Sequence, residues 1–111
     1  MGLFGFGKKN EKQPEWRFLD APNTAVYTTS FVLDGKPVTY VSHDADGDWQ
    51  FFSDDEALNK MAVLKIVGLG QMIERDHTLA GLATMPRGFG ATRSAVGEQW
   101  KGFKLDDTDE S

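Results

Sequence analysis

Two Asp-Gly pairs separate three β-rich segments in the first half of the chain, and this spacing restricts the fold more than any other feature. The segments are residues 24–33 (TAVYTTSFVL), 38–43 (VTYVSH) and 48–52 (DWQFF). Each is rich in the β-branched and aromatic residues that favour strands. Asp34-Gly35 and Asp46-Gly47 lie between the segments, and such pairs are typical of tight hairpin turns. The sequence therefore predicts an antiparallel meander of three strands.

A short helix is predicted directly after the third strand. Ser53 and Glu56 have the S-x-x-E spacing of a capping box, in which each side chain satisfies a backbone N–H at the start of a helix. Asp54 and Asp55 lie in the first turn, where the positive end of a helix favours anions. These four residues predict a helix over residues 54–60.

The apolar pattern changes between strand and helix in the second half of the chain. Residues 62–67 (AVLKIV) form a short apolar run that predicts a buried strand. Two groups with helical spacing follow, and Asp76 is a candidate cap for the second helix. The groups are Leu69, Met72 and Ile73, and then Leu79, Leu82 and Ala83. Further strands are predicted at residues 89–94 and 99–105.

These elements place the chain in the α+β class. We expect a mostly antiparallel, twisted sheet, built from the three-strand meander and the later strands, with two or three short helices on one side. Alternate residues of a strand point to opposite faces. We therefore expect Trp49 and Phe51 to face the core and Phe52 to lie on the other face.

The chain length of 111 residues suits one domain. We expect a flexible leader at residues 1–14, a single α+β domain at residues 15–105 and a disordered acidic tail at residues 106–111. The leader places apolar residues before lysines, so a weak contact with an anionic membrane and a simple frayed end are both compatible with it. Because no apolar run approaches the length of a transmembrane helix, we expect no integral membrane segment.

The chain contains no cysteine and carries a formal net charge of −5. The absence of cysteine excludes disulfides, thiolate metal sites and a cysteine nucleophile, and it fits a reducing compartment, so we expect a cytoplasmic protein. Nucleic-acid binders neutralise phosphates with lysine and arginine, so we expect no nucleic-acid partner. The charge favours a basic protein partner, although it also serves solubility.

Acidic residues near the second Asp-Gly pair form the candidate partner-binding site, because an acidic surface steers and selects basic partners. They are Asp44, Asp46, Asp48, Asp54, Asp55 and Glu56. The first three also have the spacing of a calcium loop. However, Trp49 occupies the position where the sharp turn needs glycine, and Asp55 stands where a bidentate Glu is usual. We therefore expect a hairpin turn and a helix cap here, with no metal ligands.

No residue pattern indicates a catalytic site. His43 and His77 each neighbour an aspartate, but neither has the spacing of a known metal site, and we expect both to be surface histidines. Gly68-Leu69-Gly70 has Ile73 where a dinucleotide fingerprint needs its third glycine. Residues 86–93 (PRGFGATR) are compatible with a mobile binding loop and with a turn that enters a strand. We predict no enzyme activity, no catalytic residue and no cofactor.

Three stretches, DGDWQFFSDDE, IVGLGQMIERD and LAGLATMPRGFGATR, together resemble a group of small bacterial proteins. This uncharacterised domain family has a D-G-D-W-x-F hairpin and is related to immunity proteins of polymorphic toxin systems. The resemblance spans about residues 22–100. It implies the α+β fold and a non-enzymatic, immunity-like binding role, and it defines no catalytic residues.

The first functional expectation is a small non-enzymatic protein that binds another protein through its acidic surface. The alternative is a module that binds a small ligand or a divalent metal with the turn from Asp44 to Asp48.

Overall fold

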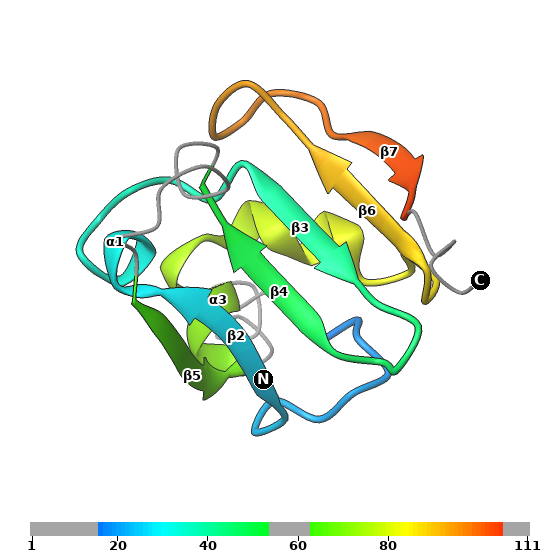
Figure 1. The fold of residues 1–111 in the computed structure, drawn as a ribbon, viewed down its shortest axis with the longest axis horizontal. Coiled ribbons are helices and arrows are strands. Elements are labelled where there is room, and N and C mark those ends of the chain that lie inside the picture. The colour runs from blue at the N-terminus through cyan, green and yellow to red at the C-terminus, as the bar shows by residue number, and fades with distance from the viewer. Residues whose placement is uncertain (1–15, 54–62, 106–111) are drawn as a thin grey trace, which may run out of the picture.

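A computed structural model describes residues 16–53 and 63–105 and has a six-stranded mixed sheet with the strand order β5-β2-β4-β3-β6-β7 (Figure 1). The strands are β2 (Ala25–Thr29), β3 (Tyr40–His43), β4 (Trp49–Phe52), β5 (Leu64–Gly68), β6 (Phe89–Thr92) and β7 (Lys101–Lys104). The helices are α1 (Ser30–Leu33), α3 (Leu69–Arg75) and the 3-10 helix η2 (His77–Leu82). The α+β class is thus confirmed. The predicted leader, the predicted helix at residues 54–60 and the predicted tail lie outside the described residues.

The predicted meander is wrong at its first connection. β2 pairs with β4 in parallel, with Tyr27 opposite Gln50, and β3 lies on the far side of β4. The cause is that residues 30–33 form α1 instead of continuing the strand. The Thr29 hydroxyl accepts a hydrogen bond from the Val32 N–H at 3.4 Å and so caps this short helix.

The first Asp-Gly pair ends α1 and forms no hairpin. Gly35 N–H donates to the Val32 carbonyl and Lys36 N–H donates to the Phe31 carbonyl, each at 3.0 Å. These two bonds are those of a Schellman motif, which requires a left-handed residue after the C-cap, and Gly35 has φ +122°. The following residues carry the chain across the end of the sheet to β3, so that β2 and β3 are not neighbours.

The second Asp-Gly pair forms the predicted hairpin. β3 and β4 are antiparallel, with Val41 opposite Phe51 and His43 opposite Trp49. Gly47 has φ +95°, which a glycine adopts without steric cost. Trp49 and Phe51 are fully buried, as predicted.

The strand predicted at residues 62–67 is wrong in its burial. It lies at residues 64–68 as β5, which among the described residues is an edge strand that pairs with β2. Leu64 and Ile66 are 58% and 64% exposed. An apolar run of this length does not distinguish a central strand from an edge strand, because periodicity carries no information about neighbours.

The core lies between the sheet and two helices that cover one of its faces. In Figure 1, α3 and the yellow-green η2 lie behind the sheet. Leu69, Met72 and Ile73 are buried on α3, and Leu79 and Leu82 are buried on η2, as their spacing predicted. In the described ranges no helix is long and apolar enough to cross a membrane.

Candidate functional site

The described part of the predicted acidic site is the tight turn between β3 and β4. One oxygen of Asp44, Oδ1, accepts hydrogen bonds from the backbone N–H of Asp46 at 3.0 Å and of Asp48 at 2.9 Å. Asp44 therefore organises the turn from within, whereas Asp46 and Asp48 are exposed at its tip. Asp54, Asp55 and Glu56 lie outside the described residues. We call the segment from Asp44 to Asp48 the acidic turn.

The acidic turn does not have the arrangement of a metal centre. Among residues 16–53 and 63–105, no group of three or more His, Cys, Asp or Glu side chains could hold a metal ion. Oδ1 of Asp44 already accepts from two amides, which reduces what the turn can offer a hard cation.

Gly47 in the acidic turn is covered by an arginine from a distant part of the sequence. A Cβ at residue 47 would lie 2.9 Å from the Cζ of Arg87. The turn and the segment that precedes β6 are also joined by backbone, because Gly88 N–H donates to the His43 carbonyl at 2.6 Å. The DGDW and PRG motifs, about forty residues apart, therefore lie against each other in the fold.

His43 is part of this junction and is half-buried, so the prediction of a surface histidine is wrong for it. Its ring stacks on the Trp49 indole with centroids 3.9 Å apart and an interplanar angle of 12°. His43 Nδ1 lies 2.8 Å from the Met85 carbonyl. Since a carbonyl only accepts, Nδ1 carries a proton and donates it, and Nε2 stays available for a further contact. His77 is exposed beside the capping Asp76, as predicted.

A cavity of about 440 Å³ opens at this junction. Its lining residues come from the segment before β2, the β3–β4 hairpin and the segment before β6. They are Arg17, Leu19, Asp20, His43, Trp49, Ala83, Thr84, Met85, Pro86 and Arg87. The sequence alone does not predict this cavity, because its lining residues come from parts of the chain that no local pattern links.

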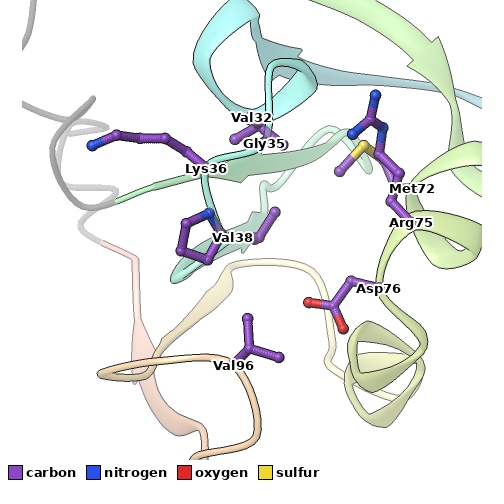
Figure 2. A pocket seen from close by; sticks show the side chains of 9 residues that line it. Val32, Gly35, Lys36, Val38, Met72, Arg75, Asp76 and Val96 are labelled. Carbon is purple, nitrogen blue, oxygen red and sulfur yellow. The ribbon is translucent and has the colours of Figure 1, made fainter.

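A second cavity, of about 350 Å³, lies between α1, the end of α3 and the loop that carries Val96 (Figure 2). Its floor is apolar and includes Val32, Val38 and Met72. One charged side chain of its wall makes a hydrogen bond within the protein, because the Arg75 guanidinium donates to the Leu33 carbonyl at 3.0 Å.

Asp76 lines the same cavity (Figure 2). Its carboxylate belongs to a buried network centred on Arg93. Arg93 donates to Asp76 Oδ2 and to the Thr78 hydroxyl, each at 2.7 Å, and twice to the Val38 carbonyl. Its guanidinium also lies 4.2 Å from the centre of the Trp100 ring, a cation–π distance. Arg93 directly follows β6, and its side chain therefore joins this strand to η2 and to the segment before β3. Residues 86–93 form a turn that enters a strand.

The network lowers the pKa of Asp76. Burial alone would raise this pKa, but the hydrogen bonds from Thr78 and Arg93, together with the charge of Arg93, outweigh the effect of burial. The Asp76 carboxylate also accepts from the Thr78 backbone N–H at 2.9 Å and so caps η2, as predicted. This acid is a structural residue and not a candidate acid or base.

The face of the sheet opposite α3 and η2 carries a strip of apolar side chains that we call the open face. Phe52 is on this face, opposite Tyr40, with ring centroids 6.3 Å apart and nearly parallel planes. Phe103 continues the row at 5.9 Å from Tyr40. The full strip comprises Tyr27, Tyr40, Phe52, Leu64, Ile66 and Phe103. The alternation of the strand predicted Phe52 on this face, but it did not predict the number of other apolar residues that lie there.

Comparisons with models of known protein families, with curated proteins and with solved structures give no match to this chain. The resemblance to the family related to immunity proteins therefore stays a prediction.

Proposed function

We propose that this chain is a small, cytoplasmic, non-enzymatic domain that binds another protein through the open face and through the acidic turn at the end of the β3–β4 hairpin. The observation that carries the proposal is the apolar strip across the open face. Leu64 and Ile66 are more than half exposed, and Phe103 is 36% exposed. Exposed apolar residues that gather on one face mark interaction surfaces far more often than single exposed residues do.

The composition of the strip supports a protein partner. Three aromatic rings in contact, Phe52, Tyr40 and Phe103, cross the sheet from β4 to β7. Tyrosine and phenylalanine are enriched at protein interfaces, because they bury a large area at a low cost in side-chain entropy. On β5 and β2, Ile66 lies opposite Tyr27 and extends the strip to the other edge of the sheet.

The acidic turn adds a preference for a basic partner. It belongs to the β3–β4 hairpin, which also carries Tyr40 and Phe52 of the open face. Asp44 fixes the turn, so Asp46 and Asp48 need little ordering when a partner binds. Charged residues at the margin of an interface mainly set the association rate and the choice of partner. An immunity-like protein that binds a basic toxin domain is the specific form of this proposal, and the resemblance of the motifs supports it.

Affinity capture from the native cell, with matched variants, tests the open face. Ile66→Ser removes an apolar side chain from the centre of the exposed β5, and Val96→Ser makes the same kind of change at a 51% exposed residue outside the open face. We expect Ile66→Ser to weaken capture of the partner at least about tenfold while Val96→Ser leaves it unchanged. Equal capture by both variants would refute the proposed surface.

A second pair of variants tests the acidic turn. Asp46→Asn with Asp48→Asn removes two exposed charges, and Asp34→Asn removes one exposed charge after α1. We expect the double variant to slow association and to reduce its dependence on salt, because steering by exposed charges is screened over about 10 Å at 0.1 M salt. Asp34→Asn should leave the salt dependence unchanged. A loss of the same size in both would show that only net charge matters.

A further inference from the structure

The cavity beside His43 has the dimensions and lining of a small-molecule site. Its volume of about 440 Å³ lies in the range of ligand pockets, which are mostly apolar with a few convergent polar groups. Leu19, Ala83, Met85 and Pro86 supply apolar surface. None of the residues that line this cavity belongs to the open face or to the acidic turn.

Its aromatic wall is held in place by several contacts. Trp49 is only 1% exposed, and its ring meets Phe18 edge-on with centroids 5.2 Å apart. The Trp49 Nε1–H donates to Asp20 Oδ2 at 3.0 Å. The His43 ring covers one face of the indole, and its Nδ1–H is fixed on the Met85 carbonyl. The wall is therefore preorganised. Among the described contacts, His43 Nε2 is the ring nitrogen of this wall that has no hydrogen-bond partner.

Two arginines give this cavity a positive character in a chain of net charge −5. Arg17 and Arg87 both line the cavity, and no described side chain forms an ion pair with either guanidinium. The third charged residue in the lining, Asp20, accepts from Trp49 Nε1–H. The guanidinium of Arg87 lies over Gly47, where the absence of a side chain leaves room for it.

We propose that this cavity binds a small anion that carries a planar ring. Guanidinium groups bind carboxylate and phosphate oxygens in a forked, charge-assisted geometry. The apolar lining and the half-buried His43 ring, which stacks on the buried Trp49, suit a flat unsaturated ring. When the ring is neutral, His43 Nε2 is an acceptor and offers one directional contact to an N–H or O–H group of the ligand. The acidic turn thus has a second role, because Gly47 positions Arg87 and Trp49 follows it as part of the wall.

Nuclear magnetic resonance titrations of the full chain test the ligand class with four probes. Benzoate and phenyl phosphate combine a ring with an anion, benzyl alcohol keeps the ring without the charge, and acetate keeps the charge without the ring. We expect saturable shifts of the Trp49 indole N–H and the Gly88 amide at about millimolar concentrations of at least one ring-bearing anion. Benzyl alcohol and acetate should bind at least about tenfold more weakly.

The two ring-bearing anions distinguish the chemical source of the charge. Tighter binding of benzoate assigns a carboxylate ligand, and tighter binding of phenyl phosphate assigns a phosphate ligand. The proposal is overturned if neither probe gives a saturable shift at these residues up to about 20 mM. It is equally overturned if benzyl alcohol binds as tightly as both anions.

Variants of exposed residues separate a specific site from general attraction of anions. Arg17→Gln and Arg87→Gln should each weaken binding of the preferred probe at least about fivefold. Lys101→Gln removes the same charge on the exposed strand β7, opposite Thr92 at the end of β6 that lies away from Arg87, and should leave binding unchanged. Binding that is equal in all three variants contradicts the proposal. Because Arg17 and Arg87 are exposed, the folded state should survive either substitution.

Discussion

The ring of Phe103 on β7 lies across Gly90 on the neighbouring β6, so that a Cβ at residue 90 would lie 2.6 Å from the ring Cζ. The two residues are directly opposite in the register. Only a residue without a side chain lets Phe103 cross β6 and contact Tyr40 on β3. Gly90 is therefore a structural requirement of the aromatic row on the open face.

Replacement of this glycine should disturb both stability and the open face. We expect Gly90→Ala to destabilise the fold by about 1–3 kcal/mol, because the new Cβ also lies 3.1 Å from the Val41 carbonyl oxygen. Gly102→Ala is the matched control on β7, because the nearest atom to its Cβ would be 3.8 Å away. Urea unfolding of both variants measures the difference, and a loss of equal size would contradict the contact.

The carboxylate of Asp44 should be worth more to the fold than its exposed neighbours in the acidic turn. Asp44→Ala leaves the N–H groups of Asp46 and Asp48 without their acceptor, and we expect a loss of about 1–2 kcal/mol. Asp46→Ala removes an exposed carboxylate and should change the free energy of unfolding by less than about 0.5 kcal/mol. Thermal denaturation at one pH compares them. An equal loss of unfolding free energy in Asp46→Ala would show that the Asp44 carboxylate does not fix the turn.

Substitution of Gly47 should displace Arg87. Gly47 and Gly35 both have positive φ, so alanine at either position should cost about 1 kcal/mol in backbone strain. A Cβ at residue 47 meets the Arg87 guanidinium at 2.9 Å, whereas a Cβ at residue 35 has no atom within 4 Å. The flexible end of Arg87 will move away at little further cost. The Nε–H resonance of Arg87 should therefore shift in Gly47→Ala and not in Gly35→Ala.

The Asp76–Arg93 ion pair should make stability depend on pH in acid. The pKa of Asp76 is lower in the folded state than its usual value of 3.8, so the unfolded chain binds more protons in this range. Stability is therefore fully present above this value and is lost as the pH falls through the folded-state pKa. Asp76→Asn should cost about 1–3 kcal/mol at pH 7, because it leaves the buried guanidinium without a counter-ion.

The effect of Asp76→Asn should shrink as the pH falls from 3.8 through the lower pKa of the folded carboxyl, below which the wild-type carboxyl is protonated as well. Denaturant unfolding at a series of pH values measures this convergence. Glu98→Gln, at an exposed residue outside the network, serves as the control. A constant difference between wild type and Asp76→Asn at all pH values would show that the carboxylate charge does not contribute.

The sequence was informative where local chemistry decides the structure. Gly47 required a tight turn, and helical spacing identified the buried faces of α3 and η2. It failed at Asp34-Gly35, because the same dipeptide suits a hairpin and the end of a helix, and the Thr29 cap decided for the helix. The mixed sheet follows from that single local choice.

Features that depend on distant neighbours could not be predicted from the sequence. The burial of Arg93 depends on Asp76 and on the Val38 carbonyl, to which no spacing rule connects it. The exposure of Ile66 depends on β5 being an edge strand. The cavity beside His43 likewise needs three separate segments to meet. The acidic residues of the predicted site were visible at once, but their division into a structural Asp44 and two exposed carboxylates was not.

Site-specific photo-crosslinking in the native cell tests the open face most directly. A photoreactive phenylalanine analogue is placed at residue 66 on the open face in one protein and at the exposed residue 96 in another. We expect one covalent adduct of a defined mass from residue 66, suppressed by an excess of unmodified chain, and no such adduct from residue 96. Adducts of equal yield at both positions, or an adduct from residue 96 alone, would contradict this expectation.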